Sequence, residues 1–314
     1  MIMNHSAVRK AYIAAILNTL IIGFSFVFVK IALQSVNSLD MLAYRFTASF
    51  AAIMILVLLG KVKLNLCWKE VATIVPLAVL YPGLFFAFQT FGLVTVSASE
   101  AGIIQAAVPI FTMIFASYWL KEHSTWQQKI ALLLSVSGLV YIFAMKGVNV
   151  GNTSLSGILL VFLSVLSLAG YNVAARKRTR IYGVMDVTFI MTSFGFVLFN
   201  SMAIFQHIAA GTTWNVLQPL TDSMFLLSIL YLGVLSSLMT AYLTNYALSK
   251  LEAVKVSVFT QLGTLVTMGA GVIILHESLQ LYHLIGAGLI IVGVLGVNIP
   301  LRQRERAGTI KKQA

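Results

Sequence analysis

The feature that most constrains this chain is an internal duplication of a long apolar segment. Residues 98–141 align without a gap with residues 253–296 under a constant offset of 155, and eight of the 44 aligned positions are identical. Each copy is an apolar run, a Leu-x-Glu turn at Glu122 or Glu277, and a second apolar run; Gly138 aligns with Gly293. Because repeats of this length are units of architecture, we expect two related halves.

Composition places both halves in a membrane. Of the 314 residues 59% are hydrophobic and 10% are charged, whereas soluble domains carry about 25% charged residues. A helix needs about 20 apolar residues to cross the bilayer, and the runs lack the alternation of barrel strands. We predict spans over residues 11–33, 40–59, 70–92, 98–120, 127–145, 155–175, 186–206, 223–249, 253–275 and 281–300.

A polar connector at residues 146–154 separates the halves. The first five-helix repeat is expected over residues 11–145 and the second over residues 155–300, followed by a basic tail at residues 301–314. Asp40 is a candidate helix N-cap, and residues 124–127 have the spacing of a capping box.

The distribution of Lys and Arg predicts the orientation of the chain. With both termini in the cytoplasm, 18 of the 21 basic residues lie on the cytoplasmic side and only Lys146 lies in an outer loop. Five spans per half is an odd number, so the halves cross the membrane in opposite directions. The predicted fold is therefore an all-α membrane protein whose ten transmembrane helices form two inverted five-helix repeats, the pattern of secondary transporters.

Several short motifs resemble a known family. The GFSFVFVK segment at residues 23–30, the pair Arg45-Phe46, and the Leu-x-Glu turns at Glu122 and Glu277 resemble the EamA module. Two such modules, covering about residues 11–300, resemble a ten-span member of the drug/metabolite transporter superfamily. The resemblance implies an inner-membrane carrier, commonly an exporter of amino acids, other metabolites or toxic compounds. It also implies a central cavity lined by the first, third and fourth spans and their mates. One departure is Met191 at the position aligned with Arg45.

Charged residues inside spans are the first candidates for substrate contact, because burying a charge in hydrocarbon is costly. Lys30, Arg45 and Glu100 are predicted toward the outer ends of their spans, where they line a vestibule for a charged substrate. The alternatives are that the basic side chains snorkel outward or that Glu100 pairs with one of them. Proton coupling through Glu100 and coupling-free transport both stay open.

Polar and aromatic side chains within the spans complete the predicted pathway, the alternative being hydrogen bonds or packing between helices. The candidate pathway residues are Asn18, Ser25, Lys30, Arg45, Tyr81, Gln89, Glu100, Gln105, Asn172, Tyr242, Asn245 and Gln261. Pro82, Gly83 and Pro109 interrupt helical hydrogen bonding and are candidate hinges, or else static kinks.

Other functional classes lack a signal. The single cysteine, Cys67, excludes a multi-Cys metal site, and we expect no catalytic residue, metal, cofactor or nucleic-acid partner. Glycines at 286, 288, 293 and 296 provide a face for packing within the fold or in a homodimer. The predicted function is export of a small metabolite such as an amino acid across the plasma membrane. An organic or nucleotide-like anion is the runner-up substrate, and a signalling or scaffold protein is the alternative class.

Overall fold

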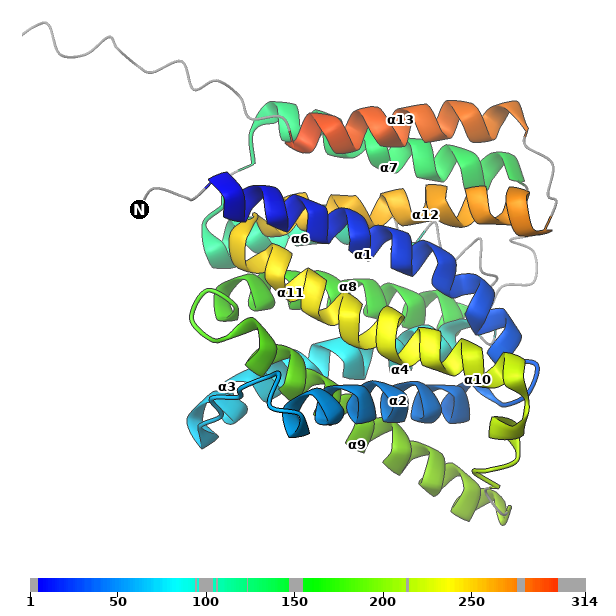
Figure 1. The fold of residues 1–314 in the computed structure, drawn as a ribbon. Helices are drawn as coiled ribbons and strands as arrows, with labels where there is room; N and C mark the ends of the chain where they lie inside the picture. Colours follow the sequence, from blue (N-terminus) through cyan, green and yellow to red (C-terminus); the bar gives the residue numbers. More distant parts are fainter. Residues whose placement is uncertain are drawn as a thin grey trace, which may run out of the picture.

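The computed structural model describes residues 5–93, 95, 104–105, 107–122, 124–146, 155–212, 215–275 and 280–298, and the regular elements in these ranges are all helical (Figure 1). The first half contains α1 (His5–Ala32), α2 (Ser38–Leu58), α3 (Trp68–Ala78), η1 (Val79–Leu84), α4 (Phe85–Leu93), α6 (Val108–Phe115), η2 (Ala116–Leu120) and α7 (Trp126–Lys146). The second contains α8 (Leu155–Arg178), α9 (Val184–Ala210), η4 (Pro219–Thr221), α10 (Ser223–Leu230), η5 (Tyr231–Met239), α11 (Thr240–Lys250), α12 (Ala253–Leu275) and α13 (Leu281–Asn298).

Within the described ranges, seven helices are long and apolar enough to cross a membrane. They cover Ser6–Ser25, Ser38–Leu58, Trp68–Gly92, Leu155–Arg178, Val184–Ala210, Ser223–Lys250 and Leu281–Asn298, and Val108–Leu120 is a shorter apolar helix. The chain is thus an all-helical, multi-pass membrane protein. Glu100, Glu277, the connector at 147–154 and the tail at 301–314 lie outside the described residues, as does the side chain of Lys30.

Helices that the repeat makes equivalent pack against each other in antiparallel pairs. In the α2–α9 pair, Asp40 contacts His207 and Thr47 contacts Asn200. In the α7–α13 pair, the Gln127 side chain donates to the carbonyl of Gly296, while Gly138 lies against Gly286. In both pairs the residue number rises along one helix as it falls along the other, so equivalent helices run in opposite directions.

Several further contacts also recur when the two halves are exchanged. Helix α4 of the first half packs on α8 of the second, and the span equivalent to α4, formed by α10, η5 and α11, packs on α1. In the same way α12 packs on α1, and its equivalent α6 packs on α8. Likewise α2 contacts η5 and α9 contacts η1. In Figure 1, α7 and α13 lie along one edge of the molecule and α9 lies along the opposite edge. The two halves are therefore interleaved rather than side by side.

The glycines of α13 pack within the chain. A Cβ atom built on Gly286 lies 2.2 Å from Ile142 Cγ1, and one built on Gly293 lies 2.6 Å from the backbone carbonyl of Ala131. A Cβ on Gly288 meets nothing within 4 Å. Three of the four glycines that the sequence offered for either role, those at 286, 293 and 296, thus serve contact with α7.

The predicted interruption of the third span is present. Between α3 and α4, Tyr81 has extended backbone angles (φ −145°, ψ 119°), and the Tyr81–Pro82 peptide bond is cis. A residue before proline is biased away from the helical region, which explains the break. Pro109 instead occupies the start of α6, where proline lacks only a hydrogen bond that the helix would not make.

Two helix starts differ from the sequence prediction. The N-cap of α2 is Asn37, whose side chain accepts from the backbone N–H of Asp40, so Asp40 lies in the first turn rather than at the cap. The reciprocal capping pair before α7 is Thr125 and Gln128, one residue later than predicted. The first cap is displaced by three residues and the second by one, shifts of the size at which helix boundaries read from sequence are ordinarily uncertain.

Candidate functional site

The centre of the structure holds a buried arginine between the two halves. Arg45 on α2 is 6% exposed, and its guanidinium reaches the widened helical segment η5 of the second half. Its Nε donates to Ser237 Oγ (2.6 Å), and its Nη2 donates to the carbonyl and the hydroxyl of Ser236 (3.0 and 3.1 Å). The guanidinium carbon lies 4.9 Å from the ring centroid of Phe86. The arginine side chain is therefore buried between helices of the two halves rather than extended toward solvent.

A small cavity of about 10 Å³ adjoins this arginine. Its lining comes from α2, η1, α4, α9, η5 and α11, through Phe46, Ser49, Tyr81, Pro82, Phe86, Met191, Thr192, Ser237 and Ala241. Such a volume holds about one water molecule, so the halves are closed around it. The spans that line it are the second, third, seventh and eighth, of which the third and the eighth belong to the set that the family resemblance implied.

A second polar cluster lies beside the cavity and links three helices of the second half. The Tyr171 hydroxyl on α8 donates to Asn245 Oδ1 on α11 (2.9 Å), and Asn245 Nδ2 donates to Thr188 Oγ1 on α9 (3.1 Å). Tyr171 also stacks on Tyr81 with ring centroids 4.8 Å apart. Because Tyr81 lines the cavity, this cluster is joined to its wall through stacked rings.

The repeat places unlike residues around the central cavity. The offset that relates Asp40 to Asp186 relates Arg45 to Met191, and Ser49 to Gly195. The offset of 155 relates Ser236 and Ser237, which accept from the arginine, to Tyr81 and Pro82 of the first half. Residues that the repeat makes equivalent across this interface thus differ in charge and in hydroxyl groups.

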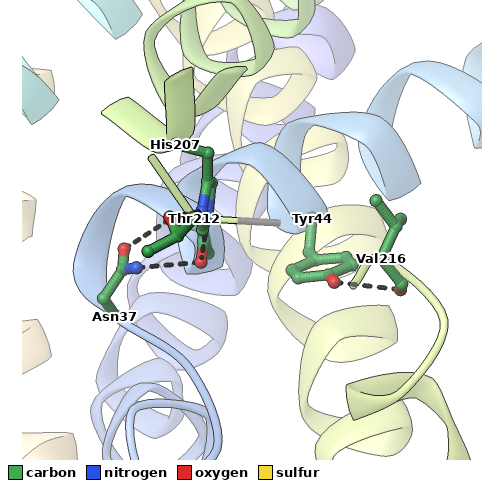
Figure 2. Close-up of polar contacts among 6 residues, drawn as sticks. Asn37, Tyr44, His207, Thr212 and Val216 are labelled. Atoms are coloured by element: carbon green, nitrogen blue, oxygen red, sulfur yellow. Dashed lines mark hydrogen bonds and ion pairs between the residues drawn. The ribbon is translucent and has the colours of Figure 1, made fainter. Parts of the chain in front are cut away.

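Polar contacts tie the first turn of α2 to the end of α9 (Figure 2). His207 Nε2 lies 3.1 Å from Asp40 Oδ1, and its Nδ1 lies 2.8 Å from Thr212 Oγ1. The Tyr44 hydroxyl donates to the backbone carbonyl of Val216 (2.9 Å), which fixes the loop after α9 against α2. These contacts close one end of the interface between α2 and α9, called here the α2–α9 seam.

A different set of contacts lies at the opposite end of the bundle. Arg176 at the end of α8 pairs with Glu122 of the first half (3.2 Å) and donates to the carbonyl of Leu248 on α11 (2.7 Å). Asp186 in the first turn of α9 accepts from the backbone N–H of Asn65 (3.1 Å). Glu122 of the first Leu-x-Glu turn thus bridges the two halves.

Of the predicted pathway residues, Arg45, Tyr81 and Asn245 are brought together around the cavity and its adjoining cluster. Asn18 and Ser25 are buried on α1, and Gln261 on α12 accepts from Ser135 on α7. Asn172 is buried on α8, and Gln89, Gln105 and Tyr242 are half-buried. Glu100 and the Lys30 side chain are outside the described residues.

Sequence reasoning missed the residues Ser49, Thr188, Ser236 and Ser237. The adjacent serines at 236 and 237 lie in the middle of the apolar run 223–250, and their position was the available signal. A hydroxyl pair at that depth needs partners, and the arginine is the partner.

Comparison with known proteins identifies the family. The EamA-like transporter family matches residues 9–144 and 155–299. The uncharacterized transporter YcxC of Bacillus subtilis strain 168 is 55% identical over 296 residues, covering 94% of this chain and 95% of that protein. An uncharacterized transporter of Archaeoglobus fulgidus is 25% identical over 296 residues, covering 94% of this chain and 100% of its own.

A crystal structure with 17% sequence identity superposes with a TM-score of 0.75, covering 93% of this chain and 98% of that chain. At this identity the likeness shows a shared fold. The two family matches together cover nearly the whole chain and coincide with the two symmetric halves. The chain therefore belongs to the EamA-like transporter family.

Proposed function

We propose that this protein is a secondary transporter that exports a small metabolite such as an amino acid across the plasma membrane by alternating access. The observation that carries the proposal is the buried Arg45 beside a cavity lined by both halves. A charge at this depth is costly and marks substrate pathways in membrane proteins. Membership of a transporter family supports the same conclusion.

The proposed architecture has ten spans in two inverted repeats, residues 11–145 and 155–300, with both termini and the basic tail at 301–314 in the cytoplasm. The antiparallel packing of the α2–α9 and α7–α13 pairs supports inversion. In this orientation the Asp40–His207 contacts face outward, and the Arg176–Glu122 bridge faces the cytoplasm. Breaking the outer contacts while the inner bridge holds opens the cavity to the outside, and breaking the inner bridge while the outer contacts hold opens it to the cytoplasm.

The inversion is tested by labelling the two Leu-x-Glu turns. In a background that lacks Cys67, cysteines replacing Glu122 and Glu277 should react with a membrane-impermeant maleimide from opposite sides of the membrane. Labelling of both turns from the same side refutes the inverted architecture.

Export is tested in cells that overexpress the protein. Cells preloaded with radiolabelled amino acids should release at least one of them faster than cells carrying an empty vector. Lys30→Ala and Glu100→Gln variants test the two other charged residues of the predicted pathway. Equal release from vector and wild type across all amino acids contradicts the proposed substrate class.

Proton coupling and coupling-free transport are the two alternatives, and Glu100 is the candidate coupling group because it is the one carboxylate that the sequence places clearly within a span. Replacing it with Gln removes a titratable group while keeping the shape of the side chain. The variant should therefore lose the dependence of transport on the pH gradient. Unchanged pH dependence refutes coupling through this residue and favours a facilitator.

A further inference from the structure

Among the described residues, the hydrogen bonds of Arg45 leave its charge uncompensated. Its acceptors are two serine hydroxyls and one backbone carbonyl, all neutral, and within the described ranges no carboxylate pairs with it. Its Nη1 has no acceptor among the described residues. Removing a cation from water is costly unless an anion and a full set of hydrogen bonds compensate it. Within the part of the chain that the structure describes, Arg45 is thus a cation with unused donors beside the cavity.

Ser49 provides a second, independent sign of a missing ligand. This α2 residue is 0% exposed and lines the cavity one helical turn beyond Arg45, yet its hydroxyl has no hydrogen-bond partner among the described residues. Buried hydroxyls are nearly always paired. A group that enters the cavity and accepts a hydrogen bond satisfies both this hydroxyl and the arginine.

We propose that the central cavity is a carboxylate site, in which the substrate's carboxylate binds the Arg45 guanidinium and accepts from the Ser49 hydroxyl. The inference rests on the proposed carrier function, because the cavity must widen when one end opens. When the cavity widens, the carboxylate takes the place of Ser237 as the acceptor of Nε, or it accepts from the Nη1 donors, which have no acceptor among the described residues. Charge-assisted bonds between a guanidinium and a carboxylate are roughly twice as strong as neutral ones.

The surroundings define which acids bind. One cation matches one negative charge, and the other walls are largely apolar, including Phe46, Tyr81 and Phe86. No acidic side chain in the described ranges lines the cavity, so an ammonium group is not what this site recognises. The substrate class is a small monocarboxylate with an apolar chain, with or without an amino group.

The experiment measures binding to the purified full-length protein by thermal unfolding and by titration. The organic probes share the isobutyl chain of leucine: leucine itself, isocaproate, which lacks the amino group, and isopentylamine, which lacks the carboxylate, all at equal millimolar concentration, with inorganic phosphate as a second oxyanion. Leucine and isocaproate should raise the Tm, and isopentylamine and phosphate should not. In Arg45→Met the affinity for isocaproate should fall at least tenfold, whereas Arg180→Met, which removes an exposed cation, should bind as wild type does.

Two further variants separate binding from folding. Arg45→Lys keeps the charge but loses the planar fork, so it should bind isocaproate more weakly than wild type and more tightly than Arg45→Met. Ser49→Ala should weaken binding severalfold without lowering the Tm of the unliganded protein, because it removes an unpaired hydroxyl.

Several outcomes overturn the carboxylate site. They are stabilisation by the amine equal to that by the acids, stabilisation by phosphate alone, no stabilisation by either acid, and unchanged affinity in Arg45→Met. Flux of labelled leucine and isocaproate into proteoliposomes tests the carrier function separately. Binding without flux refutes the carrier, whereas flux that Arg45→Met leaves unchanged refutes the carboxylate site alone.

Discussion

Two pairs of repeat-equivalent helices join the halves of this protein, and they are built differently. Along α7–α13, Gly138, Gly286 and Gly293 let one backbone touch the other, with a built Cβ on Gly138 only 2.8 Å from the Gly286 carbonyl. Along α2–α9 the contact is made by stacked rings, Phe46 on Phe199 at 4.9 Å and Phe50 on Phe196 at 4.6 Å.

The difference separates a fixed seam from one that can open. Backbone-to-backbone contact leaves no room for sliding, because any shift brings side chains into the space that only glycine leaves free. Ring contacts tolerate several offsets, and the α2–α9 ends are held by a few polar contacts. The cavity and the buried arginine also lie beside α2–α9. We therefore assign motion and substrate to this seam.

The largest expected effect comes from moving the charge to the other half. Met191→Arg places a cation at the position equivalent to Arg45. There Tyr81 and Pro82 occupy the positions that correspond to Ser236 and Ser237. Without a pair of serines placed to accept from it, the buried charge should cost about 3–5 kcal/mol of unfolding free energy, measured by denaturant titration in mixed micelles. Met191→Leu is the size control. A Met191→Arg protein as stable as the control contradicts the asymmetry of the seam.

The fixed seam is tested with a matched pair of glycines. Gly293→Val forces side-chain carbons against the Ala131 carbonyl and Ser135, so it should cost about 3 kcal/mol, the upper end of the range for overpacking. Gly288→Val points into open space and should change the unfolding free energy by less than about 0.5 kcal/mol beyond its helix propensity. Equal effects at the two positions refute the glycine seam.

These predictions depend on contacts between residues that are far apart in the chain, and local sequence patterns do not predict such contacts. The sequence placed the second span at 40–59, and the helix is Ser38–Leu58. It also located the break at Tyr81-Pro82, because apolar run length and proline chemistry are local properties. The partners of Arg45 are a different case, since Ser237 is 192 residues away. Charge and depth alone left snorkelling, a vestibule and ion pairing equally open.

The glycine stripe shows the same limit. Its spacing predicted a close-packed face on the last span but not which helix would fill it, because intrachain and intermolecular packing demand the same small residues. The structure assigns Gly286 and Gly293 to α7 and leaves Gly288 uncovered within the chain. Cap positions were displaced by a residue or more, since several neighbouring polar residues can cap a helix equally well from sequence alone.

The arginine's two anchors should differ in strength. Ser237→Ala removes the acceptor of Nε, so it should cost about 2 kcal/mol, typical of a hydrogen bond to a charged group. Ser236→Ala should cost less, because Nη2 keeps the backbone carbonyl of the same residue. Denaturant titration of the two variants, with Ser228→Ala as a third serine on the same span, measures the ranking. A larger effect at Ser236 contradicts the observed geometry.

The smallest effect on stability is expected at the Asp40–His207 contact. The two side chains are largely buried, at 9% and 17% exposed, and the contact should contribute about as much as one ordinary hydrogen bond, about 1 kcal/mol. His207→Ala should nevertheless make a cysteine at position 49 react faster with an impermeant reagent added outside. Thr212→Val, which removes only the histidine's second partner, should have a weaker effect. An unchanged rate in His207→Ala refutes its role as an outer closure.

The most direct test compares one buried serine from each seam. Ser49 beside α2–α9 and Ser135 between α7 and α13 are both 0% exposed, and each is replaced by cysteine in a background lacking Cys67. During transport, the cysteine at 49 should react with a small thiosulfonate reagent from either side of the membrane, and the cysteine at 135 should stay unmodified. Modification at 135 with none at 49 would contradict the assignment of the transport path to the α2–α9 seam.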